Sequence, residues 1–122
     1  MGGCRVSKLK ETDDCAIVAV ALACRVSYRT AKIALERYGK EPNDGAYPYQ
    51  IRRAIEHLGH QCIVKTDAYK PHYKTVRTLH RRLTSGTWIV LTCDHCLCIR
   101  DGRKYDTHSD LARTDAVYFI NP

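Results

Sequence analysis

The chain has 122 residues, 44% of them hydrophobic, and a formal net charge of +7. This length suits one domain over residues 1–122, and the hydrophobic content excludes a disordered chain. The longest apolar run, from Ala16 to Cys24, is too short to cross a bilayer, so no membrane partner is expected. The basic charge indicates either a solvated surface or contact with an acidic partner or a nucleic acid.

The seven cysteines cannot all pair within one chain, because their number is odd. The N-terminal segment MGGCRVSKLKETDD has no apolar stretch ahead of a cleavage site, so no secretory signal peptide is predicted. We therefore expect reduced thiols and a cytoplasmic location.

The first predicted element is a buried helix over residues 14–24. Thr12, Asp13 and Asp14 can cap its start, and four alanines favour a helix. Several β-branched residues in the same segment leave a buried strand as the alternative.

Two amphipathic helices are predicted next. Ser27 can cap the first of them, which we expect to end at Gly39. Pro48 can open the second, which we expect to end at Gly59. A short strand over residues 61–66 follows.

The second half of the chain changes from helical to strand patterning. We expect an extended loop over 67–74 and one more helix over 76–86, with Trp88 in the core. Apolar segments then predict four strands, over 87–93, 95–100, 103–107 and 116–120. Helices followed by an antiparallel sheet indicate the α+β class.

A β-hairpin brings an imidazole and a carboxylate together. Asp101 and Gly102 form the strongest short turn signal in the chain, and a two-residue turn there pairs Leu97 with Asp106. His95 shares a face with Leu97 because side chains alternate along a strand, and Asp106 points to that same face. His95 and Asp106 are then diagonal neighbours within reach of each other.

Cys15 is the candidate nucleophile, because backbone N–H groups and the helix dipole at a helix start stabilise a thiolate. A cysteine nucleophile needs a base, and the base needs an orienting acceptor. His95 and Asp106 can supply both. His108 stays open as a competing base, since a register slip of one residue would exchange the faces. Cys15 could alternatively be a small buried hydrophobe.

The order of these segments resembles papain-like cysteine peptidases, most closely the group that processes bacteriocin leaders after a double glycine. The residues that carry the resemblance are DDCAIVAVAL, NDGAYPYQIRRAIEHLG, GTWIVLTCDHCLCIRDG and RKYDT. It implies a papain-like α+β fold in which N-terminal helices pack on a C-terminal antiparallel sheet. It also implies Cys15 as nucleophile, His95 as general base and acid, and Asp106 as the orienting group. The substrate would be a peptide or a protein tail, cleaved through a thioester without a cofactor.

One position departs from that family pattern. Leu9 stands where the family has a glutamine that donates to the oxyanion. The backbone N–H of Cys15, with Thr12 or an amide near Asp13, would then form the oxyanion hole. The missing glutamine favours an alternative function, a papain-like scaffold that binds a partner without cleaving it.

Two further alternatives concern metals and nucleic acids. Cys93, Cys96 and Cys98 surround His95, but no second pair of ligands has finger-like spacing, so no metal is expected. Nucleic-acid binding has only the basic charge in its favour. The remaining histidines lack a partner pattern and are expected on the surface: His57, His60, His72 and His80. A small basic chain of this kind would fit a phage or mobile-element protein.

Overall fold

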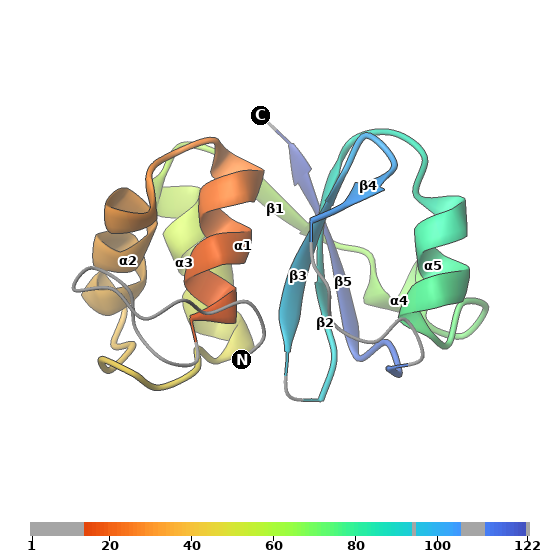
Figure 1. Ribbon diagram of the computed structural model, residues 1–122, viewed down its shortest axis with the longest axis horizontal. Coiled ribbons are helices and arrows are strands. Elements are labelled where there is room, and N and C mark those ends of the chain that lie inside the picture. The colour runs from red at the N-terminus through yellow and green to blue at the C-terminus, as the bar shows by residue number, and fades with distance from the viewer. Residues whose placement is uncertain (1–13, 94, 106–111, 122) are drawn as a thin grey trace.

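The computed structural model describes residues 14–93, 95–105 and 112–121. They form a five-stranded sheet with helices on both faces (Figure 1). Neighbouring strands are antiparallel, in the order β1-β5-β2-β3-β4, which confirms the α+β class. The strands are β1 (Gln61–Val64), β2 (Thr87–Leu91), β3 (Cys96–Arg100), β4 (Arg103–Lys104) and β5 (Ala116–Asn121). The helices are α1 (Cys15–Cys24), α2 (Tyr28–Arg37), α3 (Pro48–His57), α4 (Thr66–Tyr69) and α5 (Val76–Arg82).

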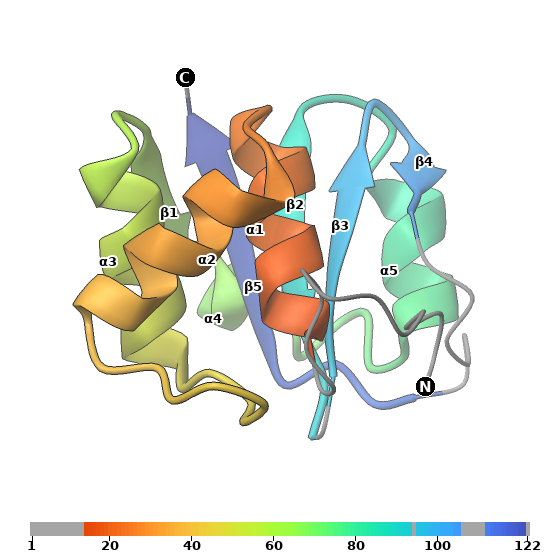
Figure 2. The ribbon, with the colours of Figure 1, turned by 60° about the vertical axis from the view of Figure 1, so that its left-hand side comes forward.

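Helix α1 lies between the sheet and α2 (Figures 1 and 2). Most of its apolar residues are buried because of this position, with Ile17 and Val20 fully enclosed. Burial on several sides explains why the sequence of α1 lacks a polar face. The helix ends at Arg25, whose left-handed backbone directs its N–H to the carbonyl of Ala21. The prediction of a helix rather than a strand is confirmed.

Local capping signals set the limits of α2 and α3. The hydroxyl of Ser27 accepts a hydrogen bond from the amide of Thr30 at 3.1 Å, which starts α2 as predicted. Pro48 is the first residue of α3, where its missing N–H costs nothing. Gly59 follows α3 with φ at 92°, a left-handed conformation that glycine adopts readily.

The predicted loop over 67–74 is wrong at its start, because α4 occupies Thr66–Tyr69. Tertiary contacts hold this single turn. The Thr66 hydroxyl accepts a hydrogen bond from the amide of Val117 at 3.1 Å. The ring of Tyr69 packs edge-on against Trp88, with centroids 5.3 Å apart. No helical period in the local sequence could reveal these contacts.

The sheet has an apolar core on each face. Side chains such as Ile89 and Cys98 pack under α1 and its neighbouring helices. Val90 and Leu97 point the other way and pack with residues of α5. We expected N-terminal helices packed on a C-terminal antiparallel sheet, and the fold has a further layer, because α5 covers the other face of the sheet. Because β2 is apolar on both faces, each face needs its own cover.

A tight turn joins β3 and β4. Asp101 and Gly102 both have positive φ, 50° and 82°, as a type I′ turn requires. Arg100 pairs with Arg103, in the predicted register. Nε2 of His80 lies 2.8 Å from the carbonyl oxygen of Gly102, so this histidine ties α5 to the turn. His80 is partly exposed, and it has this partner although the sequence indicated none. Among the described helices, none combines the length and apolarity needed to span a bilayer.

Candidate active site

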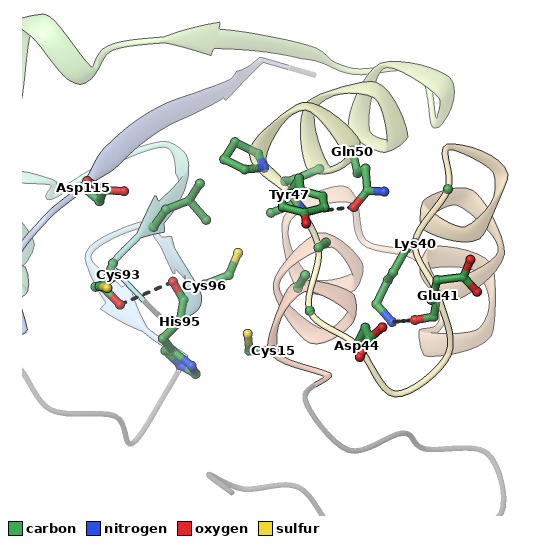
Figure 3. A pocket seen from close by; sticks show the side chains of 18 residues that line it. Cys15, Lys40, Glu41, Asp44, Tyr47, Gln50, Cys93, His95, Cys96 and Asp115 are labelled. Atoms are coloured by element: carbon green, nitrogen blue, oxygen red, sulfur yellow. Dashed lines mark hydrogen bonds between the residues drawn. The ribbon is translucent and has the colours of Figure 1, made fainter.

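A pocket of about 620 Å³ opens between the start of α1, the loop that joins α2 to α3, and the β2–β3 turn. Cys15 and His95 both line it (Figure 3). They lie on facing walls at the same end of the pocket, Cys15 at a helix start and His95 in the β2–β3 turn. The fold therefore brings these two predicted residues to one cavity from distant parts of the sequence.

Cys15 is the first residue of α1 and is half-buried. The first intrahelical hydrogen bond runs from the amide of Val18 to the carbonyl of Asp14, at 3.0 Å. The amides before Val18, including that of Cys15, thus have no carbonyl partner within the helix. Such N–H groups favour negative charge beside them, as a thiolate or an oxyanion would supply.

Asp14 occupies the N-cap position of α1, but its side chain makes no capping hydrogen bond. Its carboxylate accepts instead from the hydroxyl of Tyr28 on α2, at 3.1 Å. The carboxylate is nearly covered, since Asp14 is 4% exposed. The predicted role of Asp14 as a side-chain cap is therefore wrong. Thr12 and Asp13, the other predicted caps, lie outside the described residues.

His95 lies in the turn between β2 and β3. The amide of Thr92 donates to the carbonyl oxygen of His95 at 2.9 Å, and the Thr92 hydroxyl donates to the same oxygen at 3.4 Å. Leu91 and Cys96 form the adjacent strand pair. The backbone of His95 is thus held at the end of the ladder, next to the start of α1.

The predicted sharing of a face by His95 and Leu97 does not explain how His95 reaches this pocket. Leu97 packs in the core under α5, on the face of the sheet away from α1. Cys96 packs in the core under α1. His95 lies just outside β3, where the ladder ends, so its side chain is not confined to the face that alternation assigns. His95 therefore reaches the pocket because it lies in the turn at the end of the strand ladder, and not because side chains alternate along β3.

Asp106, the predicted orienting acid, lies outside the described residues. The hairpin register can be followed up to its neighbour. The amide of Tyr105 donates to the carbonyl of Cys98 at 3.0 Å. This hydrogen bond fits the register that would pair Leu97 with Asp106.

Asp115 lines the same pocket and was not singled out in the sequence. Its amide donates to the carbonyl of Leu91 at 2.7 Å, which fixes the start of β5 beside β2. Its carboxylate lies 3.5 Å from Nζ of Lys70 and is well exposed. Figure 3 shows Asp115 on the far side of Cys93 from the His95 imidazole. In the sequence, only the position of Asp115 directly before the start of the last strand could have indicated that it belongs to the site.

Two buried polar residues support the opposite wall, with Lys40 and Gln50 each 3% exposed. Oε1 of Gln50 accepts from the amide of Tyr47 at 2.8 Å, and its Nε2 donates to the carbonyl of Tyr38 at 3.3 Å. Nζ of Lys40 donates to the carbonyl of Glu41 at 3.1 Å. Gln50 is therefore used to hold the wall, although it lines the pocket.

Burial separates the cysteines into two groups. It raises the pKa of Cys24 to about 12 and the pKa values of Cys62 and Cys98 to about 11. These thiols stay protonated and unreactive at neutral pH. Cys93 is exposed, and Cys15 is half-buried, as Cys62 is. Among the described residues, no disulfide forms and no group of three side chains could hold a metal ion.

No family model matches the chain, and neither the curated proteins nor the solved structures give a match. A function therefore has to be inferred from the chemistry of the pocket itself.

Proposed function

We propose that this chain is a cysteine peptidase with a papain-like fold, in which Cys15 is the nucleophile and His95 the base. The observation that carries the proposal is the common pocket of the two residues, at the start of a buried helix and the end of a strand ladder. A thiol beside unpaired amide groups and an imidazole on the facing wall are the two parts that thiol catalysis requires.

The proposed reaction proceeds in two steps. His95 takes the proton from Sγ of Cys15, and the thiolate attacks the carbonyl carbon of the scissile peptide bond. The amide of Cys15 stabilises the negative oxygen of the tetrahedral intermediate. The C–N bond then breaks, the amine leaves with the proton from His95, and a thioester remains. Water attacks the thioester, His95 takes the proton of the water, and the acid is released as Sγ is reprotonated.

Asp106 is proposed to orient the imidazole from the neighbouring strand. The hydrogen bond between Tyr105 and Cys98 supports this, because it holds Tyr105, the residue before Asp106, beside β3, the strand that His95 directly precedes. Thr12 or an amide near Asp13 is proposed to complete the oxyanion hole. No cofactor takes part in this reaction.

The substrate is proposed to be an extended peptide or a protein tail. Tyr47 lines the pocket and is 68% exposed, and Tyr49 beside it is 56% exposed. Their rings stack with centroids 6.2 Å apart and an interplanar angle of 11°. Large exposed aromatic rings at a pocket supply contact area for a ligand at low entropic cost.

A binding module without activity is the second candidate. The state of Gln50 favours it: this glutamine lines the pocket, yet both ends of its amide are bonded to backbone. At least one of its two N–H donors is therefore used by the pocket wall, and Leu9 cannot act as an oxyanion donor.

Digestion of a random peptide library, read by mass spectrometry, tests the proposal. We expect new peptide termini with the wild-type protein and none with Cys15→Ala. Cys93→Ala is the matched control, because Cys93 is a pocket-lining thiol too and should be dispensable. Cleavage that persists in Cys15→Ala would refute the peptidase assignment, and binding of a protein without cleavage would favour the second candidate.

A further inference from the structure

A second pocket, of about 530 Å³, lies beside the first. Its walls carry three cationic side chains, Lys70, Lys74 and Arg113. Cys93 and Asp115 line both pockets, so the two adjoin at the β2–β3 turn. A ligand that extends from the Cys15 pocket past this turn would enter a basic environment.

The described residues that line the second pocket carry more positive than negative charge. Among them Asp115 is the only acid, and it lies 3.5 Å from Nζ of Lys70, with both side chains well exposed. Such an exposed ion pair is weak, so Lys70 can leave Asp115 and pair with a carboxylate of a ligand. Within the described part of the chain, Lys74 and Arg113 make no ion pair. The pocket therefore presents at least two cations that a negatively charged ligand could engage.

The segments that carry these cations are fixed to each other by backbone hydrogen bonds. Thr75 and Arg113 form an antiparallel bridge. The amide of Thr114 donates to the carbonyl of Lys74 at 2.9 Å. The basic side chains thus project from a paired backbone rather than from separate loops, which limits the entropy lost when a ligand binds.

Thr114 adds an unused hydrogen-bonding group to this pocket. The residue is 3% exposed, and its hydroxyl has no hydrogen-bond partner among the described residues. Buried polar groups are normally satisfied, and each exception calls for a physical reason. A hydroxyl next to cations can donate to the same carboxylate that the cations attract.

We propose that this second pocket binds the carboxylates of an acidic segment in the substrate, next to the residues held in the Cys15 pocket. The inference rests on the proposed peptidase function. Ammonium and guanidinium groups form charge-assisted hydrogen bonds with carboxylates. Continuity with the Cys15 pocket favours a peptide over a nucleic acid, because one extended chain can then occupy both pockets. A nucleic acid would instead need a row of cations along its backbone.

Binding can be measured without cleavage, using fluorescence anisotropy of a fluorescein-labelled hexaglutamate peptide at low salt with the Cys15→Ala protein. We expect binding that Lys74→Glu and Arg113→Glu each weaken roughly tenfold. Arg81→Glu is the matched control, because Arg81 is an exposed cation of α5 that does not line the pocket. Circular dichroism should show that all variants fold alike.

Three outcomes would overturn the proposal: no binding of hexaglutamate, an equal loss in the Arg81→Glu control, or tighter binding of a random single-stranded DNA oligomer that Lys74→Glu abolishes. The outcome is independent of catalysis, because Cys15→Ala cannot form a thioester. Hexaglutamate binding without any library cleavage by the wild type would refute the peptidase function and leave the anion pocket in place. Library cleavage without hexaglutamate binding would refute the pocket alone.

Discussion

The amide of Tyr47 donates a hydrogen bond of 2.8 Å to Oε1 of Gln50, and this bond joins the loop after α2 to the first turn of α3. The other end of the same side chain reaches back to the carbonyl of Tyr38, at 3.3 Å. One buried amide thus spans the loop that forms a wall of the Cys15 pocket. The shape of that wall depends on both hydrogen bonds.

Gln50→Leu should destabilise the fold by about 1–3 kcal/mol, because it leaves buried backbone groups without partners. Gln50→Glu keeps an acceptor for Tyr47 but sets a buried carboxylate oxygen against the carbonyl of Tyr38, so we expect it to destabilise the fold as well at neutral pH. Urea unfolding of the purified variants measures both effects, and equal stability of Gln50→Leu and the wild type would contradict the role assigned to this side chain.

Gly39→Ala should also destabilise the pocket wall. Gly39 has φ at 100°, and an added Cβ would lie 3.3 Å from Nε2 of Gln50. A side chain in this backbone conformation costs about 1 kcal/mol or more. Gly45→Ala in the same loop is the control, because a Cβ there meets nothing within 4 Å. Thermal unfolding should rank Gly39→Ala clearly below Gly45→Ala, and the reverse order would contradict the geometry.

The two acids of the site should respond differently to neutralisation. If Asp106 orients His95, Asp106→Asn should lower kcat by roughly 10²- to 10⁴-fold with little change in KM. Asp115→Asn should leave kcat near the wild-type value, because its carboxylate is paired with Lys70. Steady-state kinetics on a peptide found in the library digest measures both. A large loss of kcat in Asp115→Asn, with none in Asp106→Asn, would show that Asp115 rather than Asp106 orients His95.

Buried thiols should make the stability depend on alkaline pH. Burial raises the pKa of Cys24 from 9.0 to about 12 and that of Cys98 from 9.0 to about 11. Native thiols therefore keep protons that the unfolded chain loses above pH ~9. Their contribution to the free energy of unfolding is complete below that pH. It falls as the pH rises toward the pKa values of the folded state, by up to about 1.4 kcal/mol per pH unit for each thiol.

Urea unfolding at several pH values from about 8 to 10.5 measures this loss. A Cys24→Ala, Cys98→Ala double variant is the reference, since other groups titrate in both proteins. We expect a shallower decline in the double variant. An equal decline of stability with pH in both proteins would show that the pKa values of these thiols do not differ between the folded and the unfolded chain.

Local signals in the sequence predicted much of the fold. Ser27, Pro48 and the Asp101-Gly102 turn each act within a few residues, so their effect could be read without tertiary information. The position of α4 and the second core under α5 depend on contacts with β2 and β5, which are distant in sequence. The apolar residues on both faces of β2 were the signal that a second layer was needed.

The candidate site was predictable only in part. A helix start and a strand end indicated Cys15 and His95, and the fold places both in one pocket, while their catalytic roles remain proposals. The alternation rule assigned His95 to the face of Leu97, but His95 lies beyond the last residue pair of β3, where that rule no longer applies. Asp115 and the basic pocket were not predictable, since they depend on how the segment before β5 pairs with the segment before α5.

The rate of alkylation of Cys15 tests the central proposal most directly. Peptide mass spectrometry after brief iodoacetamide treatment at about pH 6.5 gives the rate for each cysteine, and Cys93 serves as the exposed reference thiol. We expect Cys15 to react faster than Cys93, although it is less exposed, and His95→Ala to remove this advantage. Alkylation of Cys15 no faster than that of Cys93 in the wild type would contradict its role as the nucleophile.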